Sequence, residues 1–426
     1  MKRTVKMIAL LLALLMLLCA CGSEKPADSP TSAAAFAPRL DTQKTVELEC
    51  AVSFGNFEAF DQVINHFNAF YPNVKVSYYQ SFSHVPDFIE NNPNVDIFMT
   101  TTEKGYPTEA CVDLVSAGVD VSAVVPGLLS GTTVDGKVLS IPMGLLLKGL
   151  VVNKTLLEKE GLSVPETWPE FLSALEMLKQ KGYTPIQGPN NAVATLCYDM
   201  AMPLIADDQK LYDAVRSGDA AGASAVKAAF EHLQELVDKG YIDPELNAEY
   251  PENNYDGAIL KFFEGDVPFW VCDTEKVSGM KKRESKSEAF SANPFSYEFI
   301  FAPLGDTGVY EFIVPWYGFA VYKNSEVYDY AVEFLRFLAQ KSELDTLASV
   351  KGVPAVTSTA SDERYVHLGS VKQVEKSVVD DGSVYRFIGT FLENEATDLL
   401  NGTVDVDEAM NNFLSHSAES AKGMTN

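Results

Sequence analysis

Positive charge is scarce in this chain. Its 33 lysines and arginines stand against 59 aspartates and glutamates, which gives a formal net charge of −26 at pH 7. Nucleic acids and anionic lipid head groups are bound through basic patches, so a chain this acidic repels both. We therefore expect neither of them as a partner.

Histidine and cysteine are also sparse. The five histidines are scattered, and no Cys-x-x-Cys pair occurs. This spacing predicts no metal site and no metal cofactor. The cysteines of the chain body are Cys50, Cys111, Cys197 and Cys272. In an exported protein two of them could form a disulfide, or all could remain buried thiols, and both alternatives stay open.

Catalytic motifs are absent as well. The chain has no Gly-x-Ser-x-Gly, no His-Glu-x-x-His and no phosphate-binding loop. Glycosidases use a pair of carboxylates, and a chain with so many acidic residues inevitably contains carboxylate pairs. No motif singles out one such pair as catalytic. We predict no catalytic residue and no enzyme, with a secreted glycan-active enzyme as the weaker alternative. The absence of repeats argues against an adhesin.

The apolar run from Met7 to Leu18 is too short to span a bilayer stably, and Lys2, Arg3 and Lys6 precede it. This pattern predicts a secretory signal over residues 1–20. The tetrapeptide that ends in Cys21 resembles the lipobox of bacterial lipoproteins. The resemblance implies cleavage before Cys21 and a diacylglyceryl group on its sulfur; an uncleaved anchor or an ordinary secretory cleavage is the alternative. Acyl chains would hold the protein on the outer face of the cytoplasmic membrane.

Residues 21–44 are polar and rich in Pro, Ala and Ser, so we predict a flexible tether from Cys21. The remaining length exceeds what one core usually organises and suggests two domains. Residues 45–54 alternate as a strand does, residues 57–70 show helical spacing with Asn56 as the expected cap, and two strands follow at 74–79 and 95–99. Strand, helix and strand in turn are typical of an α/β sheet.

Ligands of such sheets bind beyond the carboxyl ends of the strands. The loops after the first and third strands are therefore candidates for binding, and they carry Phe54, Asn56, Thr100 and Thr101. Gly55 permits close approach of the backbone. Further along, residues 134–138 form a turn between short strands, Thr167 and Glu170 form a capping box, and Gly182 and Gly240 end helices.

Several stretches together carry a family resemblance. They are "DGKVLSIPMGLLLKGLVVNK" at 135–154, "ILKFFEGDVPFWV" at 259–271, "YGFAVYKNSEVYDYAVEFLRFLAQKSE" at 317–343, "GVPAV" at 352–356 and "LLNGTVDVDEAMNNF" at 399–413. In order and spacing they resemble the extracellular solute-binding proteins of ATP-driven importers, in the large group that includes maltose- and oligosaccharide-binding proteins. The resemblance spans about residues 45–420.

The resemblance implies two α/β lobes of the periplasmic-binding-protein type, the Venus-flytrap fold, joined by crossover strands. Lobe 1 would comprise 45–150 and 303–357, and lobe 2 would comprise 151–302 and 358–426. A solute between the lobes would favour closure, and membrane permease subunits on separate chains would recognise the closed form. We expect a monomer that needs no cofactor and touches the membrane only through its lipid anchor.

Sugar sites pair flat aromatic rings with hydrogen-bonding groups. Trp316 and Tyr317, just before a returning strand, are the best candidates, because small or polar residues flank them. Tyr385 and Phe387 lie where related proteins often carry an aromatic residue on lobe 2. Core packing is the alternative for any one of these rings. Trp270 lies in an apolar run and Trp168 after a helix cap, which favours packing for both.

The chain departs from the usual sugar-binder pattern after residue 271, where relatives commonly carry Gly-x-Trp. Here Asp273 and Thr274 follow, and they and Ser278 could hydrogen-bond a polar solute. The cluster Lys281–Arg283 could attract an anion, although charge runs are more often solvated helix ends. We predict a lipid-anchored carbohydrate-binding protein of an importer, with an organic anion or a peptide fragment as the alternative solute.

Overall fold

The computed structural model describes residues 36–81, 94–100, 109–206, 208–217, 219–250, 255–305, 308–359, 374–379 and 389–423. The chain divides into the units Met1–Arg39 and Leu40–Asn426. Of the first unit only residues 36–39 are described, and they have no regular structure. The predicted signal sequence, Cys21, Thr101, Tyr385 and Phe387 lie outside the described residues.

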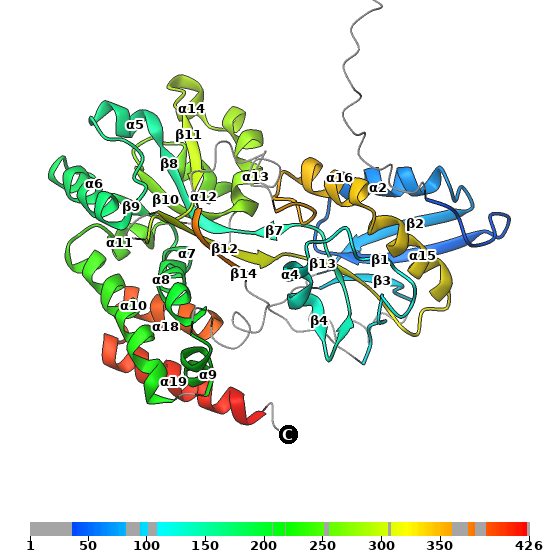
Figure 1. The fold of residues 1–426 in the computed structure, drawn as a ribbon. Helices are drawn as coiled ribbons and strands as arrows, with labels where there is room; N and C mark the ends of the chain where they lie inside the picture. The colour runs from blue at the N-terminus through cyan, green and yellow to red at the C-terminus, as the bar shows by residue number, and fades with distance from the viewer. Residues whose placement is uncertain are drawn as a thin grey trace, which may run out of the picture. The chain divides into compact units, whose positions relative to one another are not determined.

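The first sheet has five strands (Figure 1). Four of them lie within residues 46–142 and the fifth lies at residues 318–321, so segments far apart in the sequence meet in this sheet. Its order is β2-β1-β3-β13-β6, with β1 parallel to β2 and β3, and β13 antiparallel to β3 and β6. The strands are β1 (Val46–Val52), β2 (Val74–Gln80), β3 (Ile97–Thr100), β6 (Ile141–Pro142) and β13 (Gly318–Val321). The first three confirm the strands expected from the sequence. Asp96 accepts hydrogen bonds from the Glu49 amide (2.8 Å) and the Ser325 hydroxyl (2.6 Å), which ties β1 to the segment after β13.

Three helices accompany this sheet: α2 (Glu58–Asn68), α15 (Tyr328–Leu338) and α16 (Lys341–Lys351). The apolar spacing of α2 directs Phe60 and Phe67 inward, where Phe60 stacks on Phe319 of β13 at 5.0 Å between ring centroids. One expectation was wrong. Asn56 does not cap α2, because Phe57 occupies the N-cap position and no side chain caps the helix there.

The second sheet has the order β11-β8-β10-β9 and is mixed, with β8 antiparallel to both of its neighbours. Its strands are β8 (Lys148–Asn153), β9 (Ile186–Gln187), β10 (Phe269–Asp273) and β11 (Tyr297–Ile300). Trp270 of β10 is fully buried and stacks on Phe262 at 5.5 Å, so the expected core role of this ring is confirmed.

Helices lie around the second sheet (Figure 1), and most of them contribute buried residues to its core. They are α5 (Lys154–Lys159), α6 (Trp168–Gln180), α7 (Asn190–Val193), α8 (Thr195–Ala206), α9 (Gln209–Ser217), α10 (Ala220–Asp238), α11 (Pro244–Asn247), α12 (Tyr255–Phe262), α13 (Thr274–Arg283), α14 (Glu288–Ala292), α18 (Thr390–Leu400) and α19 (Val406–Gly423), with a 3-10 turn, η2 (Glu284–Lys286). Half of the expected capping box is confirmed at α6: Thr167 accepts a hydrogen bond from the Glu170 amide, but the Glu170 carboxylate accepts one from the Glu166 amide and not from that of Thr167. Trp168, half-buried, packs against this core.

A third sheet has the strand order β14-β12-β7, and its strands form no ladder with those of the two larger sheets. Its strands are β7 (Leu145–Leu146), β12 (Val309–Pro315) and β14 (Val374–Val379). A hairpin of β4 (Thr133–Val134) and β5 (Lys137–Val138) turns at Asp135 and Gly136, both with positive φ, as a two-residue hairpin loop requires. It follows α4 (Pro126–Leu129) and η1 (Ser130–Thr132).

Cys50, Cys111, Cys197 and Cys272 are buried free thiols, which resolves the choice between disulfide and thiol. Burial raises the pKa of all four; that of Cys111 rises to about 12. In the described part of the chain, no helix is both long enough and apolar enough to cross a bilayer.

Candidate functional site

Three aromatic rings from two distant parts of the chain meet at one place. Phe54 follows β1, while Trp316 and Tyr317 join β12 to β13. The Phe54 ring centroid lies 5.6 Å from that of Trp316 and 5.4 Å from that of Tyr317, both edge to face, and the latter two lie 5.1 Å apart. Trp316 is 6% exposed, whereas Phe54 and Tyr317 are half-buried and retain accessible surface. The structure thus brings together three of the residues expected at a sugar site.

Lys351, the last residue of α16, covers this aromatic cluster. Its ammonium lies 4.0 Å from the Phe54 ring centroid and 5.5 Å from that of Trp316. A cation over ring faces is attracted by their quadrupoles. Burial lowers the pKa of Lys351; Glu275 opposes this shift, and Lys282 and Arg283 add to it. Sequence reasoning missed Lys351, since a lone lysine at a helix end carries no signal.

A cavity of about 340 Å³ lies beside the cluster. The start of α2, the helix α13 and the end of α16 form its walls, to which Asn56, Ser278, Lys282, Arg283 and Lys351 contribute. Phe57 also lines the cavity and contacts Phe54 at 4.7 Å between ring centroids, so the aromatic cluster adjoins the cavity wall. The volume is in the range of small-molecule sites.

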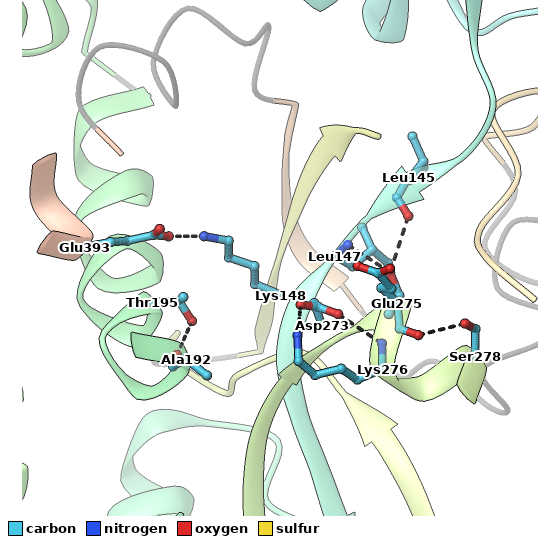
Figure 2. Close-up of polar contacts among 11 residues, drawn as sticks. Leu145, Leu147, Lys148, Ala192, Thr195, Asp273, Glu275, Lys276, Ser278 and Glu393 are labelled. Atoms are coloured by element: carbon cyan, nitrogen blue, oxygen red, sulfur yellow. Dashed lines mark hydrogen bonds and ion pairs between the residues drawn. The ribbon is translucent and has the colours of Figure 1, made fainter. Parts of the chain in front are cut away.

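Asp273, shown in Figure 2, and Thr274 both have hydrogen-bond partners within the protein. Asp273 is the N-cap of α13, accepts a hydrogen bond from the Lys276 amide (3.1 Å) and pairs with the Lys276 ammonium at 2.7 Å. The Thr274 hydroxyl is fully buried; it donates to the Leu145 carbonyl (3.3 Å) and accepts from the Leu147 amide (3.1 Å). These contacts join α13 to the segment that runs from β7 into β8.

Thr100, Ser278 and the basic cluster occupy different surroundings. Thr100 ends β3, is 2% exposed, and its hydroxyl has no hydrogen-bond partner among the described residues. The Ser278 hydroxyl donates to the Glu275 carbonyl at 2.7 Å. The cluster Lys281–Arg283 forms the last turn of α13, where its charge suits the helix dipole. Lys281 is the most exposed of these lysines and pairs with Glu284, whereas Lys282 and Arg283 reach the cavity.

A buried charged cluster that the sequence analysis did not name joins three elements of the second core. Lys148 of β8 forms an ion pair with Glu393 of α18, shown in Figure 2, and its ammonium lies 5.0 Å from the Tyr198 ring centroid. Asp199 of α8 is 1% exposed, and one of its carboxylate oxygens has no partner among the described residues. The sequence does contain one sign of this cluster, which is the lysine inside the apolar run 145–152. A charged group buried there needs a partner of opposite charge.

The stability of the protein is expected to fall between pH 4 and pH 7 because of Asp199. Burial raises the pKa of this carboxyl to about 7; Lys148 opposes the shift and Glu393 adds to it. The folded state therefore holds its proton at pH values where the unfolded chain has lost it, so stability decreases as pH rises through this window. The loss amounts to about 4 kcal/mol at most.

Denaturant unfolding of wild type and Asp199→Asn at pH 5 and pH 8 tests this expectation. Asp199→Asn should lose less stability than wild type between the two pH values. An identical pH dependence in the two proteins would contradict the assignment to Asp199.

Comparison with known proteins identifies the family. The model of the family described as "bacterial extracellular solute-binding protein" matches residues 51–343, well over half of the chain. The chain belongs to this family. A protein of Pyrococcus horikoshii described as an uncharacterized ABC transporter extracellular-binding protein is 27% identical over 191 residues, which cover 41% of this chain and 44% of that protein. The multiple sugar-binding protein of Streptococcus mutans is 44% identical over 52 residues, or 12% of each chain. The match to this solute-binding protein thus spans less than half of either relative.

Solved structures share the fold of this solute-binding protein. The binding protein MsmE of Bacillus subtilis, in an open conformation, superposes with a TM-score of 0.68 at 16% identity and covers 91% of this chain and 100% of its own. A sugar transporter protein of Bacillus licheniformis in complex with stachyose gives 0.64 at 19% identity, covering 88% and 99%. The expected two-lobe α/β fold of periplasmic solute-binding proteins is confirmed. In the described residues, no group of histidine, cysteine and acidic side chains is arranged to hold a metal ion.

Proposed function

We propose that this protein is the lipid-anchored, extracellular solute-binding component of an ABC importer and that it captures a carbohydrate. The observation that carries the proposal is the cluster of Phe54, Trp316 and Tyr317 beside a cavity of small-molecule size. Aromatic faces suit the C–H surfaces of sugars, while Asn56 and Ser278 offer hydrogen-bonding groups on the cavity wall. The complexes with stachyose and raffinose among structures of the same fold support a sugar as the solute.

The proposed mechanism is closure of the two lobes on the solute. A ligand that contacts both lobes favours the closed form, since only a difference in affinity shifts such an equilibrium. The cavity already draws its walls from α2 and α16 on one side and α13 on the other, which supports closure at this place. Permease subunits on separate chains would then bind the closed form, and Cys21 would supply the lipid anchor. No catalytic step is proposed.

A thermal-shift screen of residues 40–426, the compact unit of the structure, tests the class of solute. The panel comprises neutral oligosaccharides, monosaccharides, organic anions and short peptides. A ligand at 100 times its Kd stabilises the folded state by about 2.7 kcal/mol and so raises the melting temperature by a few degrees. Stabilisation by a glycan series supports the proposal; stabilisation by organic anions or peptides alone refutes the carbohydrate assignment.

Truncating the aromatic cluster should weaken sugar binding. For Tyr317→Ala and Trp316→Ala we expect a Kd at least about tenfold higher for the sugar found in the screen, because each loses a large apolar contact surface. Isothermal titration calorimetry measures the change. Tyr183→Ala is the control, since Tyr183 is half-buried, packs against the second core and bonds to Glu160. If Trp316→Ala binds the sugar as wild type does, Trp316 has no part in the site.

A further inference from the structure

We propose that the solute is an acidic saccharide, in which the carboxylate of a uronic acid residue binds the ammonium of Lys351 while the sugar ring lies against Phe54 and Tyr317. The inference rests on the proposed function and narrows its substrate class. It is carried by the position of Lys351, which lines the cavity and at the same time covers the aromatic cluster.

The cations of the cavity wall differ in what they already bind. Arg283 pairs with Asp256 at 2.6 Å and donates to the Gly279 carbonyl, and Lys282 lies 3.5 Å from Glu58. Lys351 has no ion pair with any carboxylate in the described ranges; the contacts of its ammonium are the faces of Phe54 and Trp316. Of the three cations, Lys351 is therefore the one that an incoming anion can bind without displacing a carboxylate.

The setting of Lys351 favours an oxyanion as its partner. A half-buried ammonium has lost part of its hydration, and cation–π contacts stabilise it less than a charge-assisted hydrogen bond would. Burial contributes most to the lowered pKa of Lys351, and repulsion by Lys282 and Arg283 adds to it, while Glu275 opposes the shift. A carboxylate at this place would relieve that repulsion and supply an acceptor for the ammonium.

The carboxylates of the wall limit the charge that the ligand can carry. Glu58 and Glu275 line the same cavity, so its walls hold three positive and two negative side chains. A densely charged polyanion would meet both carboxylates. A saccharide with one acidic group per bound ring meets a single cation and an aromatic surface, which is the combination found here.

Paired saccharides test the inference on residues 40–426 by calorimetry at low and high salt. The probes are a trisaccharide of galacturonic acid and the matching neutral trisaccharide of galactose, with a second pair built from glucuronic acid and glucose. We expect an acidic member to bind about tenfold or more tightly than its neutral partner at low salt and to lose this advantage as salt rises. A sulfated galactose trisaccharide distinguishes sulfate esters from uronic acids as the source of the oxyanion.

Variants assign the effect to one ammonium. In Lys351→Gln the affinity for the acidic sugar should fall to that for its neutral partner in the same variant, while Lys351→Arg should retain the preference for the acidic sugar. Lys281→Gln is the matched control, because Lys281 lies on α13 but does not line the cavity. A neutral sugar that binds as tightly as its acidic partner, or tighter binding of the sulfated sugar than of either uronate, overturns the inference but leaves the carbohydrate proposal intact. Binding of citrate or a peptide with no binding of any saccharide overturns both.

Discussion

Lys148→Met is expected to lower the free energy of unfolding by about 3–5 kcal/mol, a large share of the stability of an ordinary domain. Lys148 is 8% exposed, its ammonium pairs with the Glu393 carboxylate, and its charge lowers the pKa of the nearby Asp199 carboxyl. Methionine fills the space of the lysine stem but leaves two acids without this cation. The Glu393 carboxylate would lose its partner in a poorly solvated place and Asp199 would lose the attraction of the ammonium, and both changes cost free energy.

Urea unfolding followed by circular dichroism measures this loss. Lys75→Met is the control, since Lys75 pairs with Glu47 on the surface with both side chains about 70% exposed, and such pairs contribute about 1 kcal/mol or less. Adding Asp199→Asn and Glu393→Gln to Lys148→Met should recover part of the stability, because the uncompensated acids are gone. A loss below about 1 kcal/mol for Lys148→Met would show that the ion pair contributes little.

Gly149→Ala should destabilise the second sheet by about 3 kcal/mol or more. Gly149 lies in β8 between β10 and β11. A Cβ atom at this position would come closer to the Ile300 carbonyl oxygen than van der Waals contact allows and would lie 2.7 Å from Cζ of Phe299. The oxygen belongs to the backbone of the neighbouring strand, so no rotamer change relieves the clash and the two strands must separate.

Gly127→Ala is the matched control for this substitution. Gly127 lies in α4, and a Cβ atom there has no neighbour within 4 Å. Alanine restricts the unfolded chain more than glycine does, so we expect a change within about 1 kcal/mol, in the stabilising direction. The midpoint of thermal unfolding compares both variants with wild type. Equal midpoints for Gly149→Ala and Gly127→Ala would contradict the prediction, because they would mean that the strands separate at little cost in free energy.

Much of the fold was predictable because its signals are local. Alternation identified β1, residues 134–138 predicted the turn of the hairpin, and Thr167 marked the start of α6. The cap of α2 was not predictable in the same way. Asn56 has the right chemistry, but burial of Phe57 in the core shifts the start of the helix by one residue, so tertiary packing overrides the local preference. The boundaries proposed for the two lobes stay a prediction.

The site was only half predictable. Phe54, Trp316 and Tyr317 were found because aromatic residues on loops beside strand ends are conspicuous, and the structure places them in contact. Thr274 was chosen for its position relative to a family motif, yet its hydroxyl bonds to the backbone of the segment before β8. Lys351 and the cluster of Lys148, Asp199 and Glu393 depend on contacts between segments far apart in sequence, which no local pattern reveals.

The place of β13 in the first sheet has a consequence for how the chain is made. β13 hydrogen-bonds to β3 on one side and to β6 on the other, although most of the second core is encoded between β6 and β13. While the ribosome synthesises that intervening stretch, β3 has an open edge and Phe319 is not yet present to pack on Phe60. The first sheet therefore cannot close until β13 has been made, and the second core is completed later still, because α18 and α19 follow β13 in the chain.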